Sequence, residues 1–94
     1  MRLEKEKVRS DKYYRIGYVA CLGKYVLANV VCWIAWYDRF YEISEDEYLL
    51  YKTDLPSLDA LANELYGCGE RSERFLFSEK NAENTPEQAH LRQK

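Results

Sequence analysis

Hydrophobic and polar side chains alternate in the first part of the chain. Across residues 13–22 the side chains fall on two faces with a period of two, and Tyr14, Ile16 and Tyr18 share one face. Such alternation predicts a strand. The glycine and lysine at positions 23–24 then predict a turn.

A second run, residues 25–36, is apolar on both faces of the same period-two pattern. A strand with two apolar faces belongs in the middle of a sheet, because both of its sides are covered there. Residues 37–39 predict a tight connection, although they lack the glycine that is typical of such turns. Residues 40–43 predict a third strand, which runs back along the second.

A capping box predicts where the first helix begins. The Ser44 hydroxyl can accept a hydrogen bond from the backbone N–H of Glu47, and the Glu47 carboxylate can reach back to the N–H of Ser44. We expect a short helix from there to about Tyr51, and a second helix that is capped by Asp54 or Ser57. The apolar stripe of this second helix consists of Leu58, Leu61, Ala62 and Leu65.

These elements predict one α+β domain with charged or polar ends. Residues 74–78 predict a last short strand, so residues 12–78 give a small antiparallel sheet of about four strands with two short helices on one face. Residues 1–11 form a charged N-terminal segment that we expect to be frayed. Residues 79–94 have little apolar surface to bury and predict a disordered tail.

Charge is concentrated in the middle of this sequence. The 94 residues include 14 basic and 16 acidic side chains, for a net charge of -2, which disfavours a strongly basic nucleic-acid binder. Residues 37–70 alone carry nine acidic and two basic side chains. The near-neutral total therefore conceals an acidic central segment.

The cysteines and the histidine indicate neither disulfides nor a metal site. Cys21, Cys32 and Cys68 are odd in number and form no CxxC motif, and His90 is the only histidine. We interpret the cysteines as buried, reduced thiols, which suits a cytoplasmic protein. No metal and no cofactor are predicted, because no set of ligands has a suitable spacing.

Residues 18–37 are nearly apolar and long enough to be considered as a membrane span. Lys24 and Asn29 lie inside this stretch and are costly in hydrocarbon, and its β-branched residues favour strands. We therefore predict no membrane span. The N-terminus lacks the apolar region of a clear signal peptide.

No catalytic motif is present in the sequence. A serine or cysteine nucleophile needs a nearby base, and the single histidine lies in the polar tail. The three carboxylates at residues 45–47 have the pattern of a solvated helix end, with no sign of the burial that would perturb a pKa. We therefore predict a non-catalytic protein.

An acidic segment that is interleaved with tyrosines indicates a protein partner. Carboxylates can steer a basic partner toward the surface, and tyrosines can anchor it inside a polar rim. The predicted partner-binding residues are Asp38, Glu42, Glu45, Asp46, Glu47, Tyr37, Tyr41 and Tyr48. The simpler alternative, that these charges only keep a small domain in solution, fits the sequence equally well.

Two further functions remain open at this point. Tyr13, Tyr14, Arg15 and Tyr18, near Lys24, could stack single-stranded RNA on an aromatic sheet face. We favour an ordinary structural role for these tyrosines, and nucleic acid is an unlikely partner because the acidic segment repels phosphate. A homodimer that forms through an apolar sheet face is the other alternative.

The segment from Tyr41 to Tyr48, a strand that leads into a capped helix, resembles a segment of small bacterial immunity proteins. These proteins accompany polymorphic toxins, including those of contact-dependent growth inhibition. The resemblance extends over roughly residues 13–78 in general character: small, acidic, rich in tyrosine and without a catalytic set. It implies a cytoplasmic protein that binds one cognate toxin and blocks the active site or an adjacent surface. Many such toxins are nucleases with basic clefts, where an acidic inhibitor can replace nucleic acid.

Overall fold

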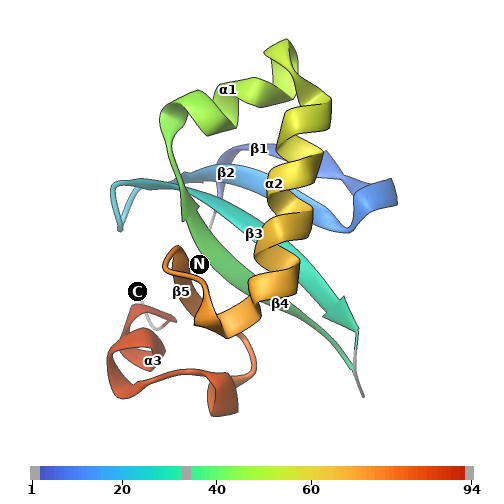
Figure 1. Ribbon diagram of the computed structural model, residues 1–94. Coiled ribbons are helices and arrows are strands. Elements are labelled where there is room, and N and C mark those ends of the chain that lie inside the picture. Colours follow the sequence, from blue (N-terminus) through green and yellow to red (C-terminus); the bar gives the residue numbers. More distant parts are fainter. Residues whose placement is uncertain (1–2, 33–34, 93–94) are drawn as a thin grey trace.

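The structure is a computed structural model that describes residues 3–32 and 35–92. In this part of the chain, five strands form one antiparallel sheet and three α-helices pack around it (Figure 1). The strands are β1 (Glu4–Arg9), β2 (Tyr14–Val19), β3 (Lys24–Cys32), β4 (Trp36–Ile43) and β5 (Phe75–Ser78). The helices are α1 (Glu45–Thr53), α2 (Leu55–Cys68) and α3 (Pro86–Arg92). The predicted α+β class is confirmed.

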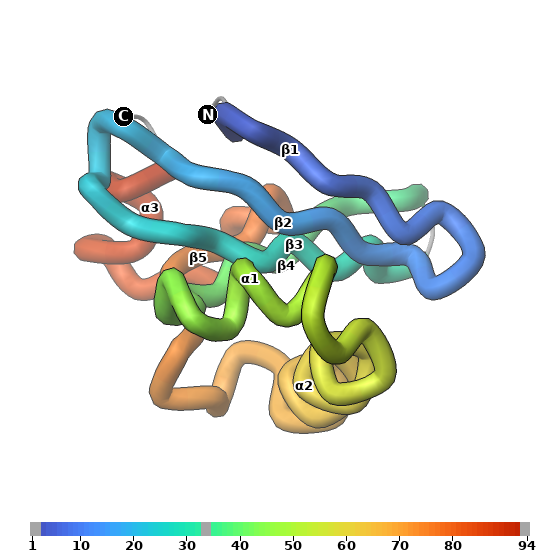
Figure 2. Tube along the Cα trace, turned by 90° about the horizontal axis from the view of Figure 1, so that it is seen from above, coloured from blue at the N-terminus to red at the C-terminus, as the bar shows by residue number. Residues whose placement is uncertain are grey.

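The sheet is a meander, in which each strand pairs with the strand before it in the order β1-β2-β3-β4-β5. β3 is the central strand, as its two apolar faces predicted. The helices α1 and α2 follow β4 and precede β5 in the chain, and they lie together on one face of the sheet (Figure 2). They therefore do not interrupt the order of the strands. Short antiparallel connections therefore generate most of the sheet.

The main hydrophobic core lies between the sheet and α2. Ile16, Leu27 and Tyr41 are neighbours across β2, β3 and β4 on the face that the helices cover. The stripe of α2 packs against them with Leu58, Ala62 and Leu65 buried, and Leu61 is partly buried. The predicted stripe is thus confirmed.

A second core lies on the opposite face of the sheet. It contains Val19, Val26, Ala28, Phe40, Leu76 and Phe77. The rings of Phe40 and Phe77 stack at a centroid distance of 4.6 Å. Leu3 and Leu91, from the two ends of the chain, pack against this cluster. Leu3 and Leu91 therefore cover part of the sheet face opposite α1 and α2.

Both ends of the chain differ from their prediction. β1 occupies part of the segment 1–11 that we expected to be frayed, and it adds a fifth strand to the sheet. In the segment 79–94, residues 81–83 form a 3-10 turn, and α3 follows it and contacts β5. The prediction of a disordered tail is wrong for these residues.

The helix boundaries follow the predicted caps. The capping box between Ser44 and Glu47 is present in both directions, and α1 extends to Thr53. The Asp54 side chain accepts hydrogen bonds from the backbone N–H and the hydroxyl of Ser57, so Asp54 caps α2. α2 ends at Gly69, whose φ of 58° lies in the left-handed region that favours glycine.

Three other local predictions are wrong. Residues 37–39 lie inside β4 and form no turn, because β4 begins at Trp36. The predicted strand 25–36 ends at Cys32 in the structure, and Trp33 and Ile34 lie outside the described residues. Cys21, Cys32 and Cys68 are free thiols, but all three are exposed, since each lies beside a turn or at an element end and none reaches the core.

No helix in the described part of the chain combines the length and the apolar character needed to cross a membrane. The apolar stretch 18–37 instead supplies the end of β2, all of β3 and the start of β4. Its β-branched side chains therefore lie in strands, where such residues are enriched.

Candidate protein-interaction surface

The predicted acidic patch does not form one surface, because two of its carboxylates are paired within the sheet. Asp38 forms an ion pair with Arg15 at 2.7 Å and is largely buried, and its backbone N–H donates to Glu79. Glu42 is more exposed and forms an ion pair with Lys24 at 2.8 Å. These charges are already partly neutralised by neighbouring strands.

Glu47 is also engaged within the molecule. Its carboxylate accepts two hydrogen bonds from the Arg74 guanidinium, at 2.6 and 2.9 Å, and a third from the backbone N–H of Ser44. Partial burial opposes ionisation, but these hydrogen bonds outweigh it and hold the pKa of Glu47 below its usual value. Glu47 therefore joins α1 to the start of β5, and it is not available for a partner.

On β4, the predicted tyrosines and the predicted acids point to opposite faces of the sheet, because side chains alternate along a strand. Tyr37 and Tyr41 lie on the face of β4 that the helices cover, opposite Asp38 and Glu42. Tyr41 is fully buried and packs edge-on against Phe75, so it cannot be the anchor that the sequence suggested. The Tyr37 hydroxyl donates to the Glu83 carboxylate at 2.9 Å and is committed to that contact.

The remaining predicted residues lie together at the start of α1. Glu45 and Asp46 are exposed in its first turn, and neither forms an ion pair with another described residue. Tyr48, one turn later, packs its ring on Tyr25 of β3 at a centroid distance of 4.8 Å. The Tyr25 hydroxyl in turn donates to the Glu45 carboxylate at 3.2 Å.

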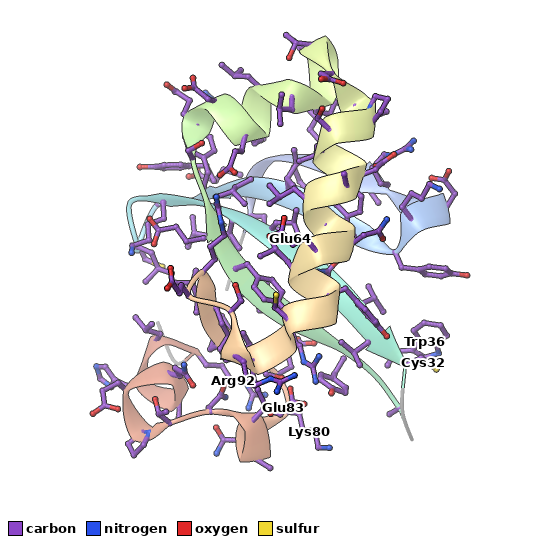
Figure 3. The ribbon with its side chains drawn as sticks, in the orientation of Figure 1. Cys32, Trp36, Glu64, Lys80, Glu83 and Arg92 are labelled. Carbon is purple, nitrogen blue, oxygen red and sulfur yellow. The ribbon has the colours of Figure 1, made fainter. Side chains whose placement is uncertain are left out.

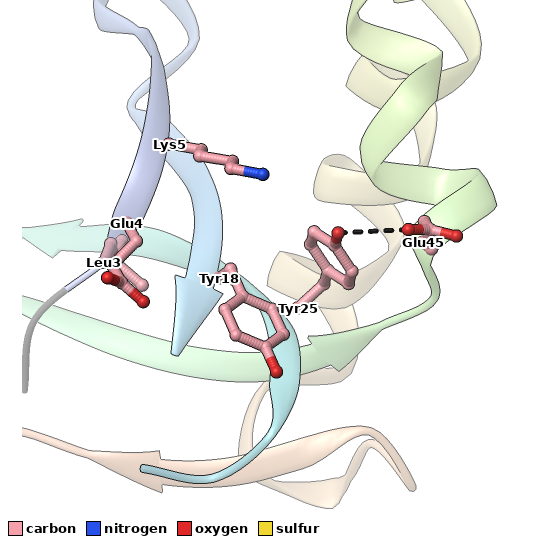
Figure 4. A pocket seen from close by; sticks show the side chains of 6 residues that line it. All are labelled: Leu3, Glu4, Lys5, Tyr18, Tyr25 and Glu45. Atoms are coloured by element: carbon pink, nitrogen blue, oxygen red, sulfur yellow. Dashed lines mark hydrogen bonds between the residues drawn. The ribbon is translucent and has the colours of Figure 1, made fainter. Parts of the chain in front are cut away.

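This group borders a hollow of about 870 Å³, which we call the tyrosine hollow. It is lined by Leu3, Glu4, Lys5, Tyr18, Tyr25 and Glu45 (Figure 4). The rings of Tyr18 and Tyr25 meet edge to face, with centroids 5.0 Å apart. Burial, followed by the hydrogen bond to Glu45, raises the pKa of Tyr25, so its hydroxyl stays protonated and donates.

An irregularity in β1 shapes one wall of the tyrosine hollow. The pairing of β1 with β2 shifts between Glu4 and Lys7, and Lys5 has a left-handed φ of 52°. Such a conformation is uncommon for a residue with a side chain and is typical of a bulge. The backbone carbonyl of Lys5 accepts a hydrogen bond from the Tyr48 hydroxyl, which joins the bulge to α1.

Gly17 permits the close approach of this wall. A Cβ atom at position 17 would lie 2.8 Å from the Leu3 Cβ and 3.0 Å from the Glu4 carbonyl oxygen. Such contacts are too short for real side chains, so a larger residue would push β1 away from β2. The glycine therefore fixes how near Leu3 and Glu4 lie to the tyrosine rings.

A second hollow, of about 350 Å³, lies at the opposite ends of β2 and β3, and we call it the aromatic hollow. Its exposed aromatic rings are Tyr13, Trp36 and Tyr66, with exposed fractions of 59%, 63% and 50%. Tyr13 and Trp36 stack with centroids 5.9 Å apart. Figure 3 shows Trp36 beside Cys32 at this end of the sheet. Lys12, Asn29, Val30, Cys32 and Asn63 complete the lining.

The position of Tyr14 disfavours the alternative function, which is RNA binding on an aromatic sheet face. Tyr14 is 2% exposed beneath α2, and its hydroxyl donates to Asp59. Arg15 lies on the opposite face and pairs with Glu6 and Asp38. The predicted aromatic and basic residues therefore do not share a surface, and base stacking on Tyr14 would require removal of the helix.

The described residues contain no group of histidine, cysteine and carboxylate side chains that could hold a metal ion. The exposed groups of the tyrosine hollow are carboxylates, an ammonium and phenol hydroxyls. This set can form ion pairs, hydrogen bonds and contacts between cations and aromatic rings. It is suited to recognition.

Sequence reasoning named Glu45, Asp46 and Tyr48 as partner-binding residues, considered Tyr18 only for stacking RNA, and did not name Tyr25 or the β1 wall. Tyr18 and Tyr25 flank the predicted turn 23–24, so hairpin register alone would have paired them across two strands. For Leu3, Glu4 and Lys5 no comparable signal exists, since a charged edge strand has no apolar alternation.

Comparison of the chain with known protein families, with curated protein sequences and with solved structures finds no significant match.

Proposed function

We propose that this protein is a non-catalytic, cytoplasmic inhibitor that binds a cognate bacterial toxin. It blocks the active site of the toxin or a basic surface beside it. The resemblance to immunity proteins suggests this class of partner, and the surface at the start of α1 suggests how the partner is held.

The observation that carries this proposal is the combination of free carboxylates and tyrosine rings at one place. Glu45 and Asp46 are exposed and without an ion pair among the described residues, whereas Asp38, Glu42 and Glu47 are paired. A carboxylate that lacks an internal partner is the one that gains most from a basic group on another protein.

The mechanism follows from charge and from contact area. The carboxylates at the start of α1 attract a basic surface and increase the rate of encounter, an effect that salt weakens. The tyrosines beside them then supply rigid contact area with polar tips. Once bound, the inhibitor excludes the substrate of the toxin from the covered surface.

The test begins with the toxic domain of the gene that directly precedes the gene of this protein. We expect its expression alone to stop growth, and co-expression of this protein to restore growth. In binding measurements on the purified pair, the double variant Glu45→Lys and Asp46→Lys should weaken affinity by about 100-fold or more, because two attractions become repulsions.

A matched control changes net charge equally on other surfaces. Glu64 and Glu87 are exposed on α2 and α3, and the double variant Glu64→Lys and Glu87→Lys should leave affinity nearly unchanged. A neighbouring gene product that is harmless, or toxicity that this protein does not relieve, would contradict the proposed function. Equal effects of the two double variants would contradict the proposed surface.

A further inference from the structure

We propose that the tyrosine hollow is a receptor for a single cationic side chain, lysine or arginine, presented by the protein partner. The inference rests on the proposed function for the identity of that partner, and it names the chemistry by which the partner is recognised.

The aromatic walls provide the first argument. The rings of Tyr18 and Tyr25, which both line the hollow, meet edge to face, and Tyr48 packs on Tyr25 at a tilt of 40°. Rings at different angles around one hollow present π faces from more than one direction. A cation within about 6 Å of such faces is attracted by the ring quadrupole.

The carboxylates provide the second argument, which is complementarity of charge. Glu4 and Glu45 line the hollow from β1 and from α1, so a cation that enters lies between two acids from different elements. The Tyr25 hydroxyl holds Glu45 in place at 3.2 Å. A neutral side chain would gain no ion-pair attraction from these two carboxylates, and an anionic one would be repelled.

The backbone of β1 provides the third argument. Lys5 adopts a left-handed conformation that is unfavourable for a residue with a side chain. Observed strain of this kind is concentrated at binding and active sites, because a simple strand would not need it. Here the strained residue lines the hollow, and its carbonyl is bonded to the Tyr48 hydroxyl.

Lys5 also explains how an acidic hollow remains stable without its partner. Figure 4 shows the Lys5 side chain reaching across the hollow toward Tyr25 and Glu45. Its ammonium forms no ion pair or hydrogen bond with another described residue. Lys5 thus adds a positive charge to the lining that contains the two acids, and the side chain of the partner replaces it on binding.

The test is an NMR titration with two pairs of small probes that differ in charge. Nα-acetyl-arginine amide is compared with Nα-acetyl-citrulline amide, and Nα-acetyl-lysine amide with its neutral Nε-acetyl derivative. We expect the two cations to shift the backbone resonances of Tyr18, Tyr25 and Glu45. The neutral probes should cause no such shifts.

Three variants locate the site. Glu45→Gln and Tyr25→Leu should each weaken the binding of the cations by about two- to fivefold. Lys5→Asn should strengthen it by a similar factor, because it removes the competing charge and because asparagine tolerates the left-handed conformation. Glu64→Gln on α2 is the control and should have no effect. Because Glu45→Gln changes no buried group, it tests the site even if Tyr25→Leu is unstable.

Equal shifts with the neutral probes, or shifts that Glu45→Gln leaves unchanged, would overturn the proposed receptor. The growth assay keeps this result separate from the proposed function. Binding of the cations without protection from the toxin would contradict the function alone. Protection that survives both Glu45→Gln and Tyr25→Leu would contradict the receptor alone.

Discussion

Two clusters of the same three side-chain types hold the two ends of the chain to the body of the protein. Each contains an arginine, a carboxylate and a tyrosine. The Asp59 cluster joins β1 to α2: Arg9 donates to both carboxylate oxygens of Asp59, at 3.2 and 2.8 Å, and the Tyr14 hydroxyl donates to one of them. A bidentate pair of arginine and carboxylate is stronger than a single hydrogen bond between the same groups.

The Glu83 cluster joins β4 to the 3-10 turn that precedes α3. Arg39 donates to both carboxylate oxygens of Glu83, at 3.0 and 2.6 Å, and the Tyr37 hydroxyl donates to one of them at 2.9 Å. The guanidinium also lies over the Tyr37 ring, with 5.8 Å between its central carbon and the ring centroid. The arrangement of bonds thus repeats that of the Asp59 cluster.

The two clusters differ in what else holds the attached segment. β1 is also bonded to β2 along its length, so the Asp59 cluster adds to an existing strand pairing. α3 has seven residues and no buried residue of its own, and Leu91 packs against the second core. The C-terminal segment therefore depends more on its polar contacts, and the same chemistry should contribute more to stability there.

Acid should produce the largest effect, because it releases both clusters. The Arg39 hydrogen bonds lower the pKa of Glu83 to about 2, and the Arg9 hydrogen bonds hold the pKa of Asp59 below its usual value. Since both pKa values are lower in the folded state, the stabilisation is complete above the unfolded-state pKa of about 4 and is lost as the pH falls toward 2. Urea unfolding between pH 2 and 6 measures this loss.

The double variant Glu83→Gln and Asp59→Asn provides the control for the acid experiment. It should show a smaller loss of stability over the same pH range, although Glu47, whose pKa is also lowered, still contributes. A pH dependence equal to that of the wild type would show that neither cluster is responsible.

The second prediction concerns the Glu83 cluster alone. Glu83→Ala leaves the Arg39 charge and the Tyr37 hydroxyl without their partner, and both groups are partly buried. We expect a loss of about 2–3 kcal/mol in the free energy of unfolding, and faster hydrogen exchange throughout α3. Glu87→Ala, an exposed site in α3, should change stability by less than about 0.5 kcal/mol. Similar losses for the two variants would contradict the assignment.

The third prediction concerns the Asp59 cluster. Asp59→Ala should cost about 1–2 kcal/mol, less than Glu83→Ala, because β1 keeps its strand pairing, although the buried Tyr14 hydroxyl loses its partner. Hydrogen exchange should increase in β1 and leave α3 unchanged. A loss as large as that of Glu83→Ala would show that the two clusters are equivalent. Because β1 forms a wall of the tyrosine hollow, this variant should also weaken the binding of the cationic probes.

The elements that sequence predicted well are those that carry their own local signal. Alternation revealed β2, a doubly apolar run revealed the central strand β3, and a capping box placed the first residue of α1. These signals work because burial and capping act over a few neighbouring residues. These local signals predicted neither the order of the strands in the sheet nor the face that the helices cover.

The ends of the chain were missed for a different reason. β1 is an edge strand with mostly charged side chains, and its position depends on Arg9 and Asp59, which are fifty positions apart. For α3 a local signal was present: Thr85 and Gln88 form a capping box around Pro86, which the polar composition of the tail obscured. The Asn84 side chain also bonds both backbone groups of Ser78.

In the candidate site, too, contacts between residues far apart in the sequence could not be predicted. Sequence distance suggested that residues 37–48 form one patch, but strand alternation and internal ion pairs divided it. What survived, Glu45, Asp46 and Tyr48, lies at a helix end, where neighbours in sequence remain neighbours in space. The partners that complete the hollow, Tyr18 and Tyr25, come from a hairpin and required the register of the sheet.

The smallest effects come from single hydroxyl groups, and they give the finest comparison of the two clusters. Tyr14→Phe and Tyr37→Phe each remove a hydroxyl that donates to a charged carboxylate. Each should cost about 1 kcal/mol, and the cost should be similar in both because the lost bond is the same. Tyr41 is the matched control, since its hydroxyl is buried and has no hydrogen-bond partner among the described residues.

Tyr41→Phe should therefore leave stability unchanged or raise it by up to about 1 kcal/mol, because it removes an unpaired polar group and leaves the ring in place. Burial already raises the pKa of Tyr41 to about 12, so the hydroxyl is neutral at ordinary pH and no charge is lost. Urea unfolding at pH 7 measures all three variants on one scale. A stability loss at Tyr41 as large as those at Tyr14 and Tyr37 would mean that its hydroxyl is satisfied after all, and that hydrogen bonding to the carboxylates does not distinguish the clusters from the core.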